Sequence, residues 1–242
     1  MNIMIFTDNK FMYENFINII KVNKLDQAHI FHYACSINNS LFDHNKNIEK
    51  IKIKDRVEEI ITIYDLAISC HSKQIFPKKI VNSVRCINIH PGFNPYNRGW
   101  YPQVFSILNK YPIGVTIHEM DEEIDHGNII VQKKINMHSW DTSLTLYNRI
   151  LQLEIELLNE NINLIIEGTY TTSPMKSEGN YNSKQDYDAL CKIDMNKNMV
   201  TKDIIDQLRA LTHGDFSNAY FIDDLGNKIF VKVILERELT NK

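Results

Sequence analysis

Glycine is scarce in this chain of 242 residues, and none of its eight glycines precedes Gly92. The turn after the first apolar segment, residues 7–10, therefore contains no glycine, although a dinucleotide fingerprint or a P-loop would need several there. A Rossmann-like sheet can form without them. We thus expect neither NAD nor ATP to bind at this turn.

Cysteine and histidine spacing argue against a metal centre. The four cysteines form no C-x-x-C pair, and the nine histidines include no H-E-x-x-H motif, because His118-Glu119 lacks the second histidine. Three of the cysteines fall in apolar segments, which is typical of buried reduced thiols. We expect no metal and no disulfide at Cys35, Cys70, Cys86 and Cys191.

Runs of one charge are missing as well. The net charge is -3 with a pI of about 6.3, and no cluster of Lys and Arg is long enough to follow a phosphate backbone. A nucleic-acid partner is therefore not expected, which weakens a transfer-RNA substrate. Residues 1–6 lack the basic region and cleavage site of a signal peptide, and polar residues follow at 7–10. We expect a globular cytoplasmic protein that does not associate with a membrane.

Strand-like and helix-like apolar patterns alternate along the first 166 residues. Such alternation predicts an α/β fold, with a Rossmann-like, mostly parallel sheet that helices cover on both faces and with chemistry at the carboxyl ends of the strands. Strands are expected at 2–6, 29–35, 65–70, 84–89, 113–117 and 128–135, and helices at 11–20, 56–62, 101–109 and 143–166, the last capped by Asp141 or Thr142.

The composition changes after Gly168, which suggests a domain at 1–168 and a small α+β extension at 169–242. Residues 169–185 are rich in Thr, Ser, Asn and Gly and predict a linker, followed by a helix at 202–211 and a hairpin of strands 219–222 and 228–235. A hairpin is marginal alone, and apolar residues fall on both faces of its second strand. We therefore expect a homodimer to which the hairpin, the helix at 143–166, or both contribute.

Three polar residues follow apolar strands in a pattern suited to acyl transfer. Asn88 and His90 alternate along one strand, so an amide and an imidazole share a face where that strand ends. Asp125 follows the next strand pattern and could orient the imidazole. Each residue has a plainer role: a carbonyl-bound strand-end histidine, a turn-capping asparagine, or a turn aspartate. Thr116 and His118 alternate on a strand, as buried neighbours of the site or as parts of it.

The motifs Asn88-Ile89-His90-Pro91, His118-Glu119-Met120 and Asp125-His126-Gly127 together resemble those of the formyltetrahydrofolate-dependent formyltransferases. The stretch Asn-Pro-Tyr-Asn-Arg-Gly-Trp-Tyr-Pro at 94–102 is similar to the sugar nucleotide branch of that family. The resemblance covers about the first 170 residues well and the tail less specifically.

The resemblance implies transfer of a formyl group from 10-formyltetrahydrofolate to an amine of a dTDP-linked amino-dideoxy sugar, for lipopolysaccharide O-antigen synthesis. The preferred acceptor is dTDP-4-amino-4,6-dideoxy-D-glucose. The alternatives are a dTDP-3-amino sugar, glycinamide ribonucleotide, methionyl-tRNA, or a module that binds folate or sugar nucleotide without catalysis. In the implied mechanism, Asn88 and protonated His90 donate to the oxyanion and Asp125 orients His90. Either His90 or Asp125 takes the proton from the amine.

The resemblance also implies residues for the two substrates. For folate these are apolar or loop residues, which could equally be core or a solvated turn: Ile75, Phe76, Pro77, Asp121, Glu122, Glu123 and Ile124. For the nucleotide sugar they lie in loops where open sheets bind ligands: Asn9, Lys73, Arg98, Trp100 and Tyr101. Lys73 could equally be solvated, and Arg98, Trp100 and Tyr101 could instead fix their loop over the sheet.

Overall fold

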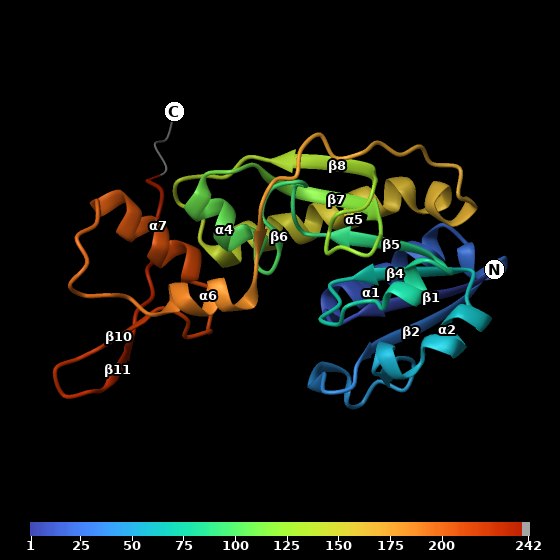
Figure 1. Cartoon of the computed structure of the whole chain (residues 1–242), viewed down its shortest axis with the longest axis horizontal. Helices are drawn as coiled ribbons and strands as arrows, with labels where there is room; N and C mark the ends of the chain where they lie inside the picture. The colour runs from blue at the N-terminus through green and yellow to red at the C-terminus, as the bar shows by residue number, and fades with distance from the viewer. Residues whose placement is uncertain (239–242) are drawn as a thin grey trace.

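A seven-stranded sheet forms the centre of the protein in the computed structural model, which describes residues 1–238 (Figure 1). Residues 239–242 of the expected extension lie outside this range. The strand order is β3-β2-β1-β4-β5-β7-β8. The strands are β1 (Asn2–Thr7), β2 (Ile30–Ser36), β3 (Glu49–Ile51), β4 (Leu66–Cys70), β5 (Arg85–His90), β7 (Ile113–Glu119) and β8 (Ile129–Ile135).

The first five strands of this sheet run parallel, and β7 and β8 pair antiparallel to their neighbours. The six expected strands are all present, and only the short edge strand β3 was not expected. After β1 the chain adds β2 and β3 on one side of β1, and then adds β4 and β5 on the other side. The strand order therefore reverses between β1 and β4. Ligands of open α/β sheets bind beyond the carboxyl ends of strands at such a reversal.

Helices cover both faces of the sheet, as the alternating pattern predicts. Strand β1 shows why: Ile3 and Ile5 pack with α1, α4 and α5, whereas Met4 and Phe6 pack with α2 and α3. The helices are α1 (Lys10–Val22), α2 (Val57–Ile63), α3 (Lys78–Val81), α4 (Pro102–Asn109) and α5 (Ser143–Glu167), with 3-10 turns at Leu25–Gln27, Ser40–Phe42 and Ile53–Asp55.

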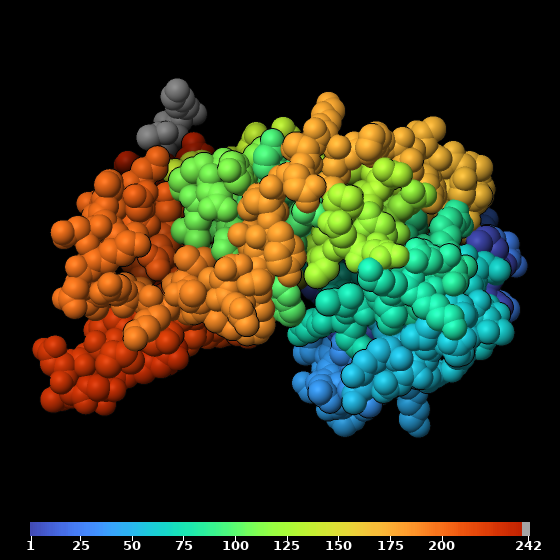
Figure 2. Space-filling view, in the orientation of Figure 1, coloured from blue at the N-terminus to red at the C-terminus, as the bar shows by residue number. Residues whose placement is uncertain are grey.

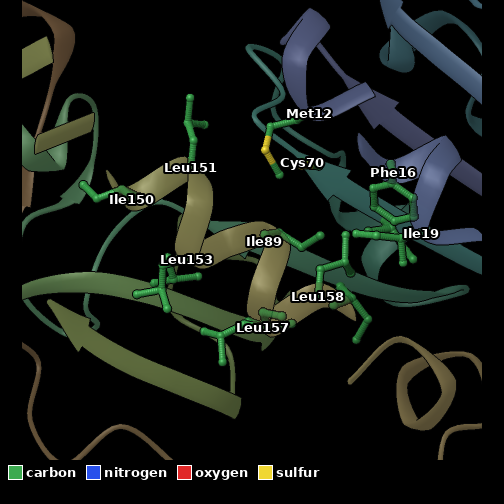
Figure 3. Packing of buried hydrophobic residues seen from close by; sticks show 14 of the residues in the cluster. Met12, Phe16, Ile19, Cys70, Ile89, Ile150, Leu151, Leu153, Leu157 and Leu158 are labelled. Atoms are coloured by element: carbon green, nitrogen blue, oxygen red, sulfur yellow. The ribbon is translucent and has the colours of Figure 1, made fainter. Parts of the chain in front are cut away.

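The long helix α5 carries much of the larger core. Thr142 caps its first turn by accepting from Thr145 N, and Gly168 ends it in the left-handed region at φ 71°. Leucines and isoleucines of α5 lie against α1 and the strands (Figure 3). One residue breaks this pattern, because Glu154 is 0% exposed in the middle of an otherwise apolar face.

The extension after α5 forms a lobe beside the sheet, orange to red in Figure 2. The expected linker at 169–185 is more ordered than predicted, since Ser173 pairs with Ile129 and β9 pairs with β6. Two-residue strands leave no periodic signal, so the sequence could not show them. The elements are β6 (Arg98–Gly99), β9 (Tyr181–Asn182), α6 (Lys184–Cys191), α7 (Thr201–Leu211), β10 (Tyr220–Ile222) and β11 (Lys228–Phe230).

The predicted hairpin is present, but its second strand is shorter than expected. Strand β11 ends at Phe230, and beyond it Val231 N still donates to the carbonyl oxygen of Ala219 at 2.9 Å. Residues 231–238 form no regular strand. Among the described residues, no helix is both long and apolar enough to cross a bilayer.

The packing of α5 predicts a stability difference between two of its leucines. Leu158 is fully buried and Leu164 is 44% exposed. Leu158→Ala should lower the free energy of unfolding by about 2–5 kcal/mol, because it leaves a cavity in the core. Leu164→Ala is the matched control and should change it by less than about 0.5 kcal/mol. Urea unfolding at one protein concentration measures both, and equal losses would contradict this assignment of the buried face.

Candidate active site

A cavity of about 770 Å³ opens beyond the carboxyl ends of β1, β4 and β5. The sheet domain supplies most of its wall. The extension supplies the rest, through Tyr181 of β9, Tyr187 of α6, and His213, Phe216 and Asn218 between α7 and β10. The cavity therefore lies where the strand order reverses, as the sequence predicts for a ligand site in such a sheet.

Asn88, His90 and Asp125 meet at this cavity. Asn88 Nδ2 donates to Asp125 Oδ1 at 2.9 Å, and His90 Nδ1 lies 3.5 Å from Asp125 Oδ2. His90 is 3% exposed, and the Asp125 side chain is 10% exposed. The structure thus brings together the three residues that the sequence motifs single out.

His118 lies beside this trio on β7, where it is paired with Asn88 of β5. His118 Nδ1 lies 2.6 Å from the carbonyl oxygen of Glu119, which leaves Nε2 to accept from Asn88 Nδ2 at 3.3 Å. Both hydrogens of the Asn88 amide nitrogen are therefore engaged, one by Asp125 and one by His118. To donate to a substrate oxygen, Asn88 must release one of them, and the His118 contact is the longer.

The backbone around Asp125 is held by the loop that follows β5. Asp125 has a positive φ of 51°, Asn94 Nδ2 donates to its carbonyl oxygen at 2.8 Å, and Gly99 N donates to its Oδ2 at 2.9 Å. Thr116 fixes the same loop, since its Oγ1 accepts from Asn94 N and donates to the Gly92 carbonyl. The stretch 94–102 therefore supports the carboxylate.

Gly92 allows the His90 ring to occupy its place. A Cβ atom at residue 92 would lie 2.2 Å from His90 Nε2. Because real Cβ atoms do not approach another atom that closely, any other residue there would displace the imidazole. Nε2 itself is buried and has no hydrogen-bond partner among the described residues.

Burial keeps His90 neutral at rest. Desolvation lowers the pKa of His90 to about 4, although the Asp125 carboxylate opposes this shift. Burial alone would raise the pKa of Asp125, but the two histidines and Gly99 N–H hold it below its usual range. The resting pair is then an anionic Asp125 beside a neutral imidazole.

The residues expected to hold folate lie mostly along one side of the cavity. Phe76 and the loop from Asp121 to Ile124 line it, as does Ile75, which is 72% exposed. Pro77 does not line it and precedes α3 instead. An apolar wall beside loop backbone suits a flat heterocycle such as a pterin.

Four of the five residues expected to hold the nucleotide sugar also line the cavity: Asn9, Lys73, Trp100 and Tyr101. Arg98 does not. It is 6% exposed, and its guanidinium donates to Glu178 at 2.8 Å and to the Ile124 carbonyl at 3.4 Å. Arg98 thus fixes the loop over the sheet, which was the alternative left open for it.

The sequence motifs did not single out several polar residues of the cavity wall. Asp8, at the end of β1, accepts from Ser36, Asn39 and Lys73 N and so ties three loops together. His71 and Tyr147 line the cavity from β4 and α5. The charged residue within the apolar stripe of α5, Glu154, was the one signal that could have pointed to this second polar group.

Comparison with known proteins agrees with this geometry. The model described as "Formyl transferase" matches residues 19–162, which is more than half of the chain. This chain belongs to the formyl transferase family. A second model, "N-formyltransferase dimerization C-terminal domain", matches residues 186–237 of this formyltransferase.

Relatives of known name are similar over most of their length. The dTDP-4-amino-4,6-dideoxyglucose formyltransferase of Mycobacterium bovis is 47% identical, over 79% of this chain and 82% of the relative. A 4-N formyltransferase structure from Francisella tularensis is 46% identical, with a TM-score of 0.91 and 98% of both chains covered. An N-formyltransferase from Helicobacter canadensis, in complex with folinic acid and dTDP-3-aminofucose, is 26% identical, with a TM-score of 0.64 over 86% of this chain and 79% of that one.

The lowered pKa of His90 predicts a pH-dependent stability. The unfolded chain binds a proton at His90 near pH 6.5, whereas the folded chain binds it only near pH 4, so stability falls as the pH falls through this window. The shift corresponds to about 3 kcal/mol. His90→Asn should remove this part of the pH dependence. Unfolding free energies at pH 7 and pH 4.5 test it, and parallel changes in parent and variant would contradict it.

Proposed function

We propose that this formyltransferase transfers the formyl group of 10-formyltetrahydrofolate to the 4-amino group of dTDP-4-amino-4,6-dideoxyglucose. The observation that carries the proposal is the trio of Asn88, His90 and Asp125 at the edge of one cavity. The 4-amino preference is supported by relatives above 45% identity, whose names specify the 4-amino sugar or 4-N transfer. The dTDP-3-aminofucose complex belongs to a protein only 26% identical.

The site can perform this reaction with its own residues. The formyl donor supplies an electrophilic carbon, and the amine attacks it. As negative charge develops on the formyl oxygen, Asn88 donates an amide hydrogen to it, a contribution on the order of 3 kcal/mol. Neutral His90 accepts the amine proton, and the Asp125 carboxylate stabilises the imidazolium that results. In this proposal His90, rather than Asp125, is the first proton acceptor. The bond between the formyl carbon and N10 of the donor then breaks, and the His90 imidazolium gives its proton to that nitrogen, so that tetrahydrofolate leaves.

The cavity has room and chemistry for both substrates. We propose that the wall of Phe76 and residues 121–124 holds the pterin, and that Asn9, Lys73, Trp100 and Tyr101 face the nucleotide sugar. The buried free thiols, such as Cys70 and Cys86, fit a reducing cytoplasm. The formamido sugar would then serve O-antigen assembly.

A panel of amines tests the proposal. The purified protein is incubated with 10-formyltetrahydrofolate and, in turn, dTDP-4-amino-4,6-dideoxyglucose, a dTDP-3-amino sugar, glycinamide ribonucleotide and methionyl-tRNA. Release of tetrahydrofolate is measured. We expect turnover to be fastest with the 4-amino sugar. No release with that sugar would refute the proposed acceptor, and faster release with another amine would replace it.

Substitution of the catalytic trio should separate chemistry from folding. His90→Asn should lower kcat by about 100-fold or more, because the amine loses its proton acceptor. Asp125→Asn should also lower kcat strongly, because an amide cannot stabilise an imidazolium. The matched control is His44→Asn, which alters an exposed histidine outside the cavity wall. A His90 variant as active as this control would remove His90 from the mechanism.

We further propose that the chain forms a homodimer through its extension. The match to a dimerization domain at residues 186–237 supports this assembly. Large apolar side chains of the hairpin are also exposed, with Ile229 at 39% and Phe230 at 47%. Burying such a surface against a second copy would stabilise a hairpin that is marginal alone.

The dimer proposal predicts a mass change on disrupting the hairpin. Light scattering at micromolar concentration should give about twice the 28.4 kDa of one chain. Phe230→Asp should shift the mass toward one chain, since a charge buried in an apolar interface is costly. Ile63→Asp, on an exposed residue at the end of α2, should leave the dimer intact. A parent of single-chain mass would refute the dimer, and an unaffected Phe230→Asp would place the interface elsewhere.

A further inference from the structure

A second polar cluster lies at the cavity, apart from the catalytic trio. Asn9 Nδ2 donates to the Tyr147 hydroxyl at 3.0 Å, the Tyr147 hydroxyl lies 3.2 Å from His71 Nδ1, and His71 Nε2 lies 2.7 Å from Glu154 Oε2. The cluster joins the N-terminus of α1, the residue after β4 and the middle of α5. His71 adopts a positive φ of 58°, an uncommon conformation for a residue other than glycine that is concentrated at functional sites.

The buried carboxyl group of Glu154 determines which atoms of this cluster carry hydrogens. It is 0% exposed, and its Oε1 has no partner among the described residues. Burial raises the pKa of its carboxyl group, and His71 opposes that shift. Because an uncompensated buried charge is costly, the pair is neutral overall: either Glu154 keeps its proton, or His71 carries the balancing charge. In both states a hydrogen sits on His71 Nδ1 and points at Tyr147.

The Tyr147 oxygen therefore accepts two hydrogen bonds. One comes from His71 Nδ1. The other comes from Asn9, whose amide orientation is fixed because its Oδ1 accepts from Met12 N at 3.1 Å as the cap of α1. With both lone pairs of the phenol oxygen occupied, the hydroxyl hydrogen must point elsewhere. Tyr147 lines the cavity, so this hydrogen is available to a ligand there.

The cluster and the expected folate wall lie on opposite faces of the sheet. Tyr147 packs in the core of α1, α4 and α5, whereas Phe76 and Met120 pack in the core of α2 and α3. Tyr147 and the expected folate wall therefore line the cavity from different cores.

We propose that Tyr147 donates its hydroxyl hydrogen to an oxygen of the amino sugar nucleotide, and that His71 and Glu154 are positioning residues that keep it a donor. The inference rests on the proposed function, since it needs that acceptor in the cavity. It adds a substrate contact and a buried support to the catalytic trio.

The first test removes only the phenol oxygen. Tyr147→Phe should lower kcat/KM for the amino sugar nucleotide by about 3- to 10-fold, as expected for one lost hydrogen bond, through a higher KM. The KM for the formyl donor should stay within twofold. Tyr170→Phe is the matched control, because that hydroxyl donates to Glu119 outside the cavity wall. Inhibition by free dTDP then tells which oxygen accepts: weaker inhibition of Tyr147→Phe indicates the nucleotide part, and equal inhibition indicates the sugar.

The second test addresses Glu154. Glu154→Gln should keep kcat/KM within threefold of the parent, because an amide N–H can still donate to His71 Nε2 and leave the hydrogen on Nδ1. Glu154→Leu should match Tyr147→Phe, and combining the two should cost nothing further.

Three results decide the inference. If the parent is active and the kcat/KM of Tyr147→Phe lies within twofold of the parent value, the substrate contact of Tyr147 is refuted and the proposed function is not. Equal losses in Glu154→Gln and Glu154→Leu refute the positioning role. A parent that does not formylate the amino sugar refutes the proposed function, and the inference with it.

Discussion

The buried carboxylate of Asp125 is the constraint on which the site depends. It can remain charged in a cavity wall only because Asn88 and Gly99 donate to it and two histidines lie within 4 Å. Each donor comes from a different segment, so the position of the carboxylate sets the position of the loop after β5. The cost of desolvating this charge is thus offset by donors from separate segments, one of which, Asn88, also serves the proposed reaction.

Asn97 holds the loop that supplies Gly99. It is 0% exposed, and its Oδ1 accepts from the amides of Asn109, Asn180 and Asn182 while its Nδ2 donates to Ser106. The asparagines at 180 and 182 belong to the extension, at and beside β9. Order in the loop that supplies Gly99 therefore depends on residues more than 80 positions away from Asn97 in the sequence, through buried polar contacts.

The sequence predicts the elements that have a regular apolar period and the polar residues that lie at or after the end of a strand. The six main strands, the length and Thr142 cap of α5, and the meeting of Asn88, His90 and Asp125 follow from such local patterns. The roles of Arg98 and of the segment 169–185 do not, because both depend on contacts between distant loops. The pKa of His90 was also beyond the sequence, since it reflects how completely the fold excludes water.

Because His213, Phe216 and Asn218 form part of its wall, the cavity is built by both the sheet domain and the extension. In the proposed function, the chemistry resides on β5 and the loop at Asp125, whereas part of the cavity wall comes from a segment with no reacting group. Under this proposal, exchange of that segment alone is expected to change which amine is accommodated while the transfer chemistry stays intact. Substrate range and reaction type can therefore diverge independently in descendants of this architecture.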